Sequence, residues 1–227
     1  MPDTLPMRFA TLVLALALFC HIAQAHTDMG PCSTAYSQSN DGIALLQRTA
    51  QTLTEGGGVK ATFTLTTPDD GSIGGSIDLQ GECFRLQMGG LITWFDGTTQ
   101  WTYSANTEEV NVSLPTTEEL QAINPYAWLT LYKQGYAVSV ERSSSSGGQT
   151  KQVVTMTKPA NSRGPAMVKL TMLSSTCQLT RVEIVMSIGE QPTTIDITSY
   201  QAMQNFPSSH FCFPADQYPS AEIIDLR

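Results

Sequence analysis

The chain has 227 residues, of which 41% are hydrophobic, and its 20 acidic and 12 basic residues give a formal net charge of −8. An acidic chain with scattered Lys and Arg residues cannot neutralise a row of phosphates, which argues against nucleic-acid binding. The same charge predicts repulsion from anionic membrane surfaces. The roughly 200 residues that follow the N-terminal segment suit one large domain.

The N-terminal segment has the pattern of an export signal. Arg8 precedes an apolar run over residues 9–20, which is too short to span a bilayer. Ala23 and Ala25 place small residues at the two positions that a signal peptidase reads. We therefore expect residues 1–25 to be a signal peptide that is removed on export.

Cleavage at this point makes His26 the first residue of a mature domain that covers residues 26–227. One alternative is an N-terminal membrane anchor, which the shortness of the apolar run disfavours. Another is a lipid-modified Cys20, which is disfavoured because the bulky Phe19 stands where such a site has a small residue. No later segment is long and apolar enough to cross a bilayer.

Export also bears on the cysteines, because disulfides form in oxidising compartments. The four that remain after cleavage are Cys32, Cys83, Cys177 and Cys212. They allow three disulfide connectivities, between which the sequence does not decide. No cysteine or histidine pair has metal-ligand spacing, so we expect no metal site.

The first predicted element after the leader is a helix over residues 42–53, with Asp41 as its N-cap and a broad apolar face. From residue 59 onward, apolar and polar residues alternate with a period of two, which is typical of strands with one buried face. Alternating or apolar segments follow at 77–79, 84–88, 91–95, 101–103, 110–114, 136–140, 151–157, 167–173, 179–188, 193–200 and 223–224.

This pattern predicts a mainly β protein with a few helices. We expect about ten or eleven strands in antiparallel meander order. Since a twisted sheet of this size tends to curl, we expect it to form an incomplete antiparallel β-barrel. A second helical region interrupts the strands. Thr116 and Glu119 have the spacing of a capping box, and Asn124 can cap a further helix that starts at Pro125.

That further helix is apolar on almost every side over residues 126–132, before Gly135 ends it. A short helix of this kind requires burial on every side. We expect it to lie across the concave face of the sheet as a lid over an apolar cavity. The residues expected to line the cavity and lid are Phe63, Leu65, Phe84, Leu86, Met88, Trp101, Tyr103, Tyr126, Trp128, Leu129, Tyr132, Met156, Met172 and Met186.

Enzymatic function finds little support in the sequence. The mature chain has two histidines, His26 and His210, and no Gly-x-Ser-x-Gly motif. The acidic pairs are adjacent in the chain, so their side chains do not face one another. A remote alternative is a copper enzyme in which an N-terminal His26 chelates the metal together with His210. We expect no catalytic residue and no cofactor.

Residues 94–103 carry a recognisable motif, in which a turn at Asp96 and Gly97 is followed by Trp101 and Tyr103. This segment resembles the periplasmic outer-membrane lipoprotein carrier family, the LolA-like proteins. The resemblance extends over residues 108–111, 116–127, 132–136 and 218–227, and these features are typical of the branch found in Bacteroidetes.

The resemblance implies a periplasmic carrier whose helices close an apolar cavity. The cavity would bind the acyl chains of lipoproteins and carry them from the inner to the outer membrane. It implies two partners, an inner-membrane lipoprotein-releasing transporter and an outer-membrane acceptor, and we expect a monomer. Alternatives on the same scaffold are a carrier of free lipids, glycolipids or a hydrophobic small molecule, and a sensor protein.

One departure from the family pattern concerns the lid. Better-known carriers have a Lys-Arg-Pro sequence before the Asp-Gly hairpin, and its arginine holds the lid in place. The corresponding residues 79–82 here read Leu-Gln-Gly-Glu, and Arg85 is displaced from that position. We therefore expect either that other residues hold the lid or that its opening is controlled differently.

Overall fold

The computed structural model describes residues 39–227 except 56, 117, 118, 121–124, 145–149, 161 and 163. The expected signal peptide, His26 and Cys32 lie outside the described residues. Among the described residues, no helix combines the length and the apolar character that a membrane crossing requires.

Helix α2 (Asn40–Glu55) opens the described chain. The Oγ of Ser39 accepts a hydrogen bond from the Gly42 N–H at 3.2 Å, so Ser39 is the N-cap of this helix. The prediction that Asp41 caps it was wrong by two residues. Asp41 lies instead in the first turn, where its negative charge faces the positive end of the helix dipole.

The rest of the chain is mainly β. The strands are β1 (Gly58–Thr67), β2 (Gly71–Gln80), β3 (Cys83–Met88), β4 (Leu91–Phe95), β5 (Gln100–Ser104), β6 (Glu109–Ser113), β7 (Ala137–Ser144), β8 (Thr150–Thr157), β9 (Met167–Leu173), β10 (Leu179–Val185), β11 (Thr193–Gln204) and β12 (Glu222–Asp225). The sequence predicted nearly all of them, because each has the period-two alternation of a sheet with one buried face.

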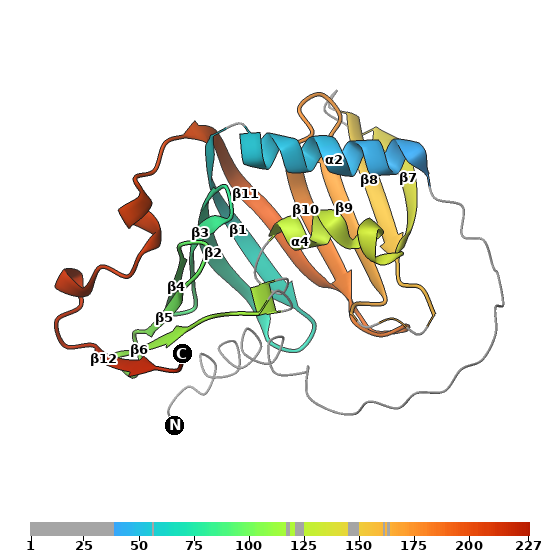
Figure 1. Ribbon diagram of the computed structural model, residues 1–227. Coiled ribbons are helices and arrows are strands. Elements are labelled where there is room, and N and C mark those ends of the chain that lie inside the picture. The colour runs from blue at the N-terminus through green and yellow to red at the C-terminus, as the bar shows by residue number, and fades with distance from the viewer. Residues whose placement is uncertain are drawn as a thin grey trace.

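The twelve strands form a single sheet in the order β12-β6-β5-β4-β3-β2-β1-β11-β10-β9-β8-β7. Two antiparallel meanders meet where β1 pairs with β11. Register shifts in this pair, near Lys60 and Phe63, bend the sheet between its two halves. The sheet does not close, since β12 and β7 are its two edges, and an incomplete barrel is confirmed (Figure 1).

The expected purely antiparallel order was wrong for the last strand. Strand β12 pairs in parallel with β6, with Ile223 beside Val110. The reason is the long connection, residues 205–221, which returns from the far end of β11 and runs down the other side of the sheet (Figure 1). We call this connection the C-terminal strap. It contains the short 3₁₀ helices η2 (Ser208–Phe211) and η3 (Ala215–Gln217).

Helix α4 (Pro125–Thr130) and the 3₁₀ helix η1 (Leu131–Gln134) form the second helical layer. The expected start at Pro125 and the stop at Gly135 are confirmed, and Gly135 has the left-handed φ of 87° that glycine tolerates best. The capping box is also confirmed. The Thr116 N–H donates to Glu119 Oε2 at 2.7 Å, and the Glu119 N–H donates to Thr116 Oγ1 at 3.3 Å.

Both α2 and α4 lie on the same face of the β7–β11 half of the sheet (Figure 1). We call this face the inner face and the opposite face the outer face. The main hydrophobic core lies between the inner face and the two helices. Its fully buried members include Leu46, Leu129, Met156, Leu170 and Met172.

The stability of this core is testable at Leu170, which is fully buried at the centre of β9. We expect Leu170→Ala to lower the free energy of unfolding by about 2–5 kcal/mol, because it removes buried methyl groups and leaves a cavity. Leu114→Ala is the matched control, since Leu114 is 55% exposed, and we expect it to change stability by less than about 0.5 kcal/mol. Urea unfolding measures both, and equal effects would contradict this assignment of the core.

Candidate functional site

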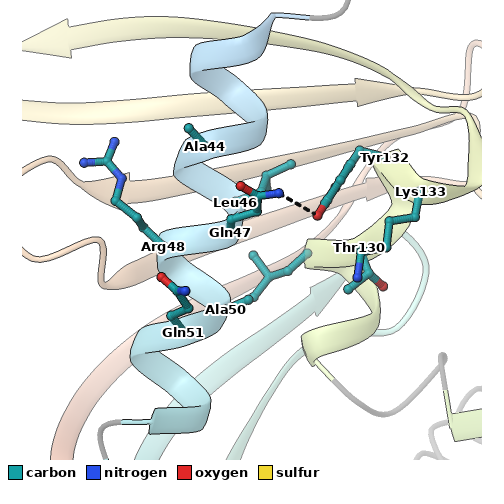
Figure 2. A pocket seen from close by; sticks show the side chains of 10 residues that line it. Ala44, Leu46, Gln47, Arg48, Ala50, Gln51, Thr130, Tyr132 and Lys133 are labelled. Atoms are coloured by element: carbon teal, nitrogen blue, oxygen red, sulfur yellow. Dashed lines mark hydrogen bonds between the residues drawn. The ribbon is translucent and has the colours of Figure 1, made fainter.

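An open groove of about 610 Å³ lies between the two helices. One wall comes from α2 and the other from α4 and η1, as Figure 2 shows. The lining residues are Ala44, Leu46, Gln47, Arg48, Ala50, Gln51, Leu129, Thr130, Tyr132 and Lys133. The groove therefore lies on the solvent side of the helical layer.

The groove is apolar at its floor and polar at its rim. Leu46 and Leu129 are 0% and 1% exposed, because each helix turns these residues toward the sheet. At the rim, Gln47 Nε2 donates a hydrogen bond to Tyr132 OH at 3.4 Å, which joins α2 to η1. Figure 2 shows this bond crossing between the helices, while Arg48 extends away from η1. A long, exposed bond of this kind adds little stability.

Helix α2 packs directly on the sheet beside two methionines. Met156 and Met172 are fully buried in the core cluster, and Thr49 Oγ1 of α2 approaches Met172 Sδ at 3.2 Å. The apolar cavity that we expected between the sheet and its helical cover stays a prediction. Because the two helices cover the inner face, a ligand reaches the residues beneath them only if the helices move.

Most of the residues predicted to line the cavity do face the inner side. They form one core cluster with the helices or pack against it: Phe63, Leu65, Phe84, Leu86, Met88, Trp128, Leu129, Tyr132, Met156 and Met172. Tyr126 belongs to α4, but its side chain lies outside the described part of the structure.

Three of the predicted lining residues lie elsewhere. Trp101 pairs with Trp94 and Tyr103 with Ile92, which places both side chains on the outer face. There the ring centre of Tyr103 lies 4.5 Å from that of Tyr218 in the C-terminal strap. Period two assigns alternate residues to two faces, but it does not say which face becomes concave.

Met186 is the third. It follows the end of β10 and is 47% exposed, so it contacts solvent and not the core. The alternation that predicted a strand up to residue 188 was too long at this end, because β10 stops at Val185.

The inner face becomes polar beyond β4, a feature that our sequence analysis missed. Thr93, Thr102 and Asn111 occupy successive inner positions on β4, β5 and β6. Thr93 Oγ1 and Thr102 Oγ1 share a hydrogen bond at 3.4 Å. The apolar inner surface is therefore limited to β1–β4 and β7–β11. Polar residues at alternate positions of β5 and β6 were the available signal.

The sequence also did not predict that α2 forms one wall of the site. It predicted an amphipathic helix there, but it placed the lid in residues 126–132 alone. The structure shows α2 as the second wall, with Leu46 and Ala50 in the groove. Helical periodicity identifies an apolar face without identifying the element that faces it.

Arg85 does not hold the lid. Its guanidinium carbon lies 5.8 Å from the centre of the Trp94 ring, on the outer face and away from both helices. The bond between Gln47 and Tyr132 joins the two helices, and which residues hold the lid stays a prediction.

The turn at Asp96 and Gly97 forms as predicted. Asp96 Oδ1 accepts hydrogen bonds from the N–H groups of Thr98 and Thr99 at 2.9 and 2.8 Å. Gly97 has a φ of 99°, which glycine adopts at little cost. This turn orients the β4–β5 hairpin and has no place in the groove.

The cysteines do not pair as expected within the described residues. Cys83, Cys177 and Cys212 are free thiols in the structure, and Cys32 lies outside the described part. Among the residues that the structure describes, no three His, Cys, Asp or Glu side chains are grouped as a metal site requires. His210 lies on the outer face, where its Nε2 is 2.8 Å from Asp78 Oδ2.

The open sheet, its two covering helices and the groove between them offer a concave, partly apolar site of the kind that ligands occupy. The sequence matches the family model described as "Outer membrane lipoprotein carrier protein LolA" over residues 32–190. Because this match spans well over half of the chain, the protein belongs to the LolA family. Members of the family are periplasmic carrier proteins that bind lipids or lipoproteins.

One solved structure shares this fold, and others are similar at lower TM-scores. An uncharacterized conserved protein from Thermus thermophilus matches with a TM-score of 0.59 at 13% identity, over 82% of this chain and 99% of that one. A putative outer membrane lipoprotein-sorting protein domain from Vibrio parahaemolyticus matches with a TM-score of 0.43 at 11% identity, over 76% and 96%. A LolA superfamily protein from Nitrosomonas europaea gives 0.39 at 12% identity, over 76% and 97%. No curated protein matches the sequence significantly.

The contact between the helices is testable at Tyr132. We expect Tyr132→Phe to change the free energy of unfolding by less than about 1 kcal/mol, because the lost bond is long and exposed. We also expect it to raise the binding of a fluorescent apolar dye, since the helices separate more easily. Tyr136→Phe is the control. It loses a buried bond to the Pro165 carbonyl at 2.9 Å and is expected to lose stability without added dye binding. Equal dye binding by the two variants would contradict this role of Tyr132.

Proposed function

We propose that this protein is a periplasmic carrier that binds the acyl chains of lipoproteins and transports them from the inner to the outer membrane. In this proposal residues 1–25 are the signal peptide and residues 26–227 form the carrier domain. The observation that supports it most strongly is the open groove between two helices that cover a continuous apolar sheet face.

The energetics of this arrangement favour exchange between helices and cargo. In the described structure six apolar side chains of the helical layer are buried against the sheet: Leu45, Leu46, Leu53, Trp128, Leu129 and Leu131. At about 1.5–3 kcal/mol each, their burial is worth on the order of 10–20 kcal/mol. A saturated acyl chain of about sixteen carbons gains about 12 kcal/mol from similar burial. An acyl chain therefore offsets much of the cost of displacing the helices.

Near balance of this kind suits a carrier, which must bind its cargo and also release it. A tight preformed pocket would retain the chain, whereas helices that return to the sheet compete with it. The helix contact at Gln47 and Tyr132 is weak enough to break during loading. An inner-membrane lipoprotein-releasing transporter and an outer-membrane acceptor are the partners that this function requires.

The experiment uses Trp128 of α4 as a reporter, because the other two tryptophans lie on the outer face. We expect a triacylated cysteine peptide to shift the emission of Trp128, which is only 9% exposed, as α4 leaves the sheet. The same peptide without acyl chains should have no effect.

The matched controls are Trp128→Phe, which should abolish the fluorescence change, and Trp101→Phe, which should preserve it. If the protein binds acyl chains, excess unlabelled lipopeptide should also displace a labelled triacylated peptide from it. If the acylated peptide neither shifts the emission nor co-elutes with the protein in gel filtration, the transport function is refuted.

A second candidate is a carrier of free lipids, glycolipids or a hydrophobic small molecule. The groove volume of about 610 Å³ favours it, because that volume falls within the range of small-ligand pockets. Mass spectrometry of ligands extracted from the native protein distinguishes the two. Lipidated peptides support the lipoprotein carrier, and peptide-free lipids support the alternative.

A further inference from the structure

The C-terminal strap is anchored to the outer face of the sheet by polar contacts with β2. Gln80 contacts the Phe206 backbone twice, since its Oε1 accepts from the Phe206 N–H at 2.9 Å and its Nε2 donates to the Phe206 carbonyl at 3.3 Å. Two residues earlier on β2, Asp78 Oδ2 lies 2.8 Å from His210 Nε2. The strap thus meets β2 at two successive outer positions.

Aromatic contacts continue the attachment across β4 and β5. The ring centre of Phe213 lies 5.5 Å from that of Trp94, and Tyr218 contacts both Trp94 and Tyr103. The strap therefore covers a second apolar layer, which includes the buried residues Trp94, Val110, Val112 and Phe211 and is separate from the main core.

Two cysteines lie where the strap crosses the start of β3. Cys83 is the cross-strand partner of Gln80, and it belongs to the same outer face. Cys212 lies between His210 and Phe213, whose contacts are to β2 and β4 on either side of β3. The contacts of the strap thus place Cys212 over the first residues of β3.

Electrostatics agrees with this placement. Burial raises the pKa of the Cys83 thiol, and the Asp96 carboxylate and Cys212 raise it further. Burial and the same Asp96 carboxylate raise the pKa of Cys212. The two thiols therefore have the Asp96 carboxylate as a common charged neighbour.

We propose that Cys83 and Cys212 are a disulfide site that covalently fastens the C-terminal strap to β3. Cys177 is excluded as a partner for either, because it lies in the β9–β10 turn and packs against the main core of the inner side. The pairing is independent of what the groove binds.

The oxidant is a disulfide, such as oxidised glutathione or a thiol–disulfide exchange protein. A thiolate of the pair attacks one oxidant sulfur, which forms a mixed disulfide and releases the first thiol of the oxidant. The second protein thiolate then attacks the mixed disulfide and releases the second thiol. The two protein thiols lose two electrons and two protons in total, and the oxidant disulfide becomes two thiols. Because both pKa values are raised, we expect the rate to increase with pH through the alkaline range.

The test incubates the full chain with oxidised glutathione and maps its peptides by mass spectrometry without reduction. We expect a linked pair that contains Cys83 and Cys212, two hydrogens lighter than the separate peptides. The oxidised protein should unfold at a temperature roughly 5–15 °C higher than the reduced protein, since the bond closes a long loop. Cys83→Ser and Cys212→Ser should each abolish this difference, and the control Cys177→Ser should keep it.

A measurement on the unmodified chain covers the case in which a serine variant does not fold. Limited proteolysis within residues 205–221 should be slower after oxidation, and reduction should restore its rate. The proposal is overturned if Cys83 and Cys212 remain open to alkylation after oxidation, or if either is linked to Cys32 or Cys177.

Discussion

The structure depends on covering the apolar inner face of an open sheet. Alternating residues such as Val59, Ala61, Phe63 and Leu65 give the strands one apolar side, and water contact along that side costs about 25 cal/mol per Å². The sheet ends in two unpaired edges, β12 and β7, so it does not enclose this face by itself. Helices α2 and α4 provide the cover, and the core cluster includes residues from both helices and from both halves of the sheet.

The two faces of the sheet are covered by different means. On the inner face the helices present apolar side chains to the sheet, and a weak polar contact at Gln47 joins them. On the outer face the strap is held by short polar contacts, as at Asp78, and by edge-to-face aromatic contacts, as at Trp94. An apolar cover is interchangeable with other hydrocarbon, whereas directional hydrogen bonds hold one particular segment. The helices on the inner face are therefore suited to exchange with a hydrocarbon ligand, whereas the strap is suited to stay bound to the outer face.

Much of the fold was predictable because its signals are local. Period-two alternation identified the strands, and the capping box at Thr116 and Glu119 and the stop at Gly135 identified helix ends. The Asp96 turn formed as its sequence predicted, since a carboxylate and a glycine meet its backbone requirements within four residues. The family resemblance at residues 94–103 and beyond agrees with the family match.

The sequence by itself determined the elements, their apolar sides and the family, because these follow from neighbouring residues. Only the tertiary structure decided that Trp101 and Tyr103 face outward, that β12 pairs in parallel, and that α2 and α4 together cover the inner face. Each of these depends on contacts between residues far apart in the chain. Alternation creates two faces in every strand, but the bend at β1 and β11 and the path of the strap select which of them becomes the inner face.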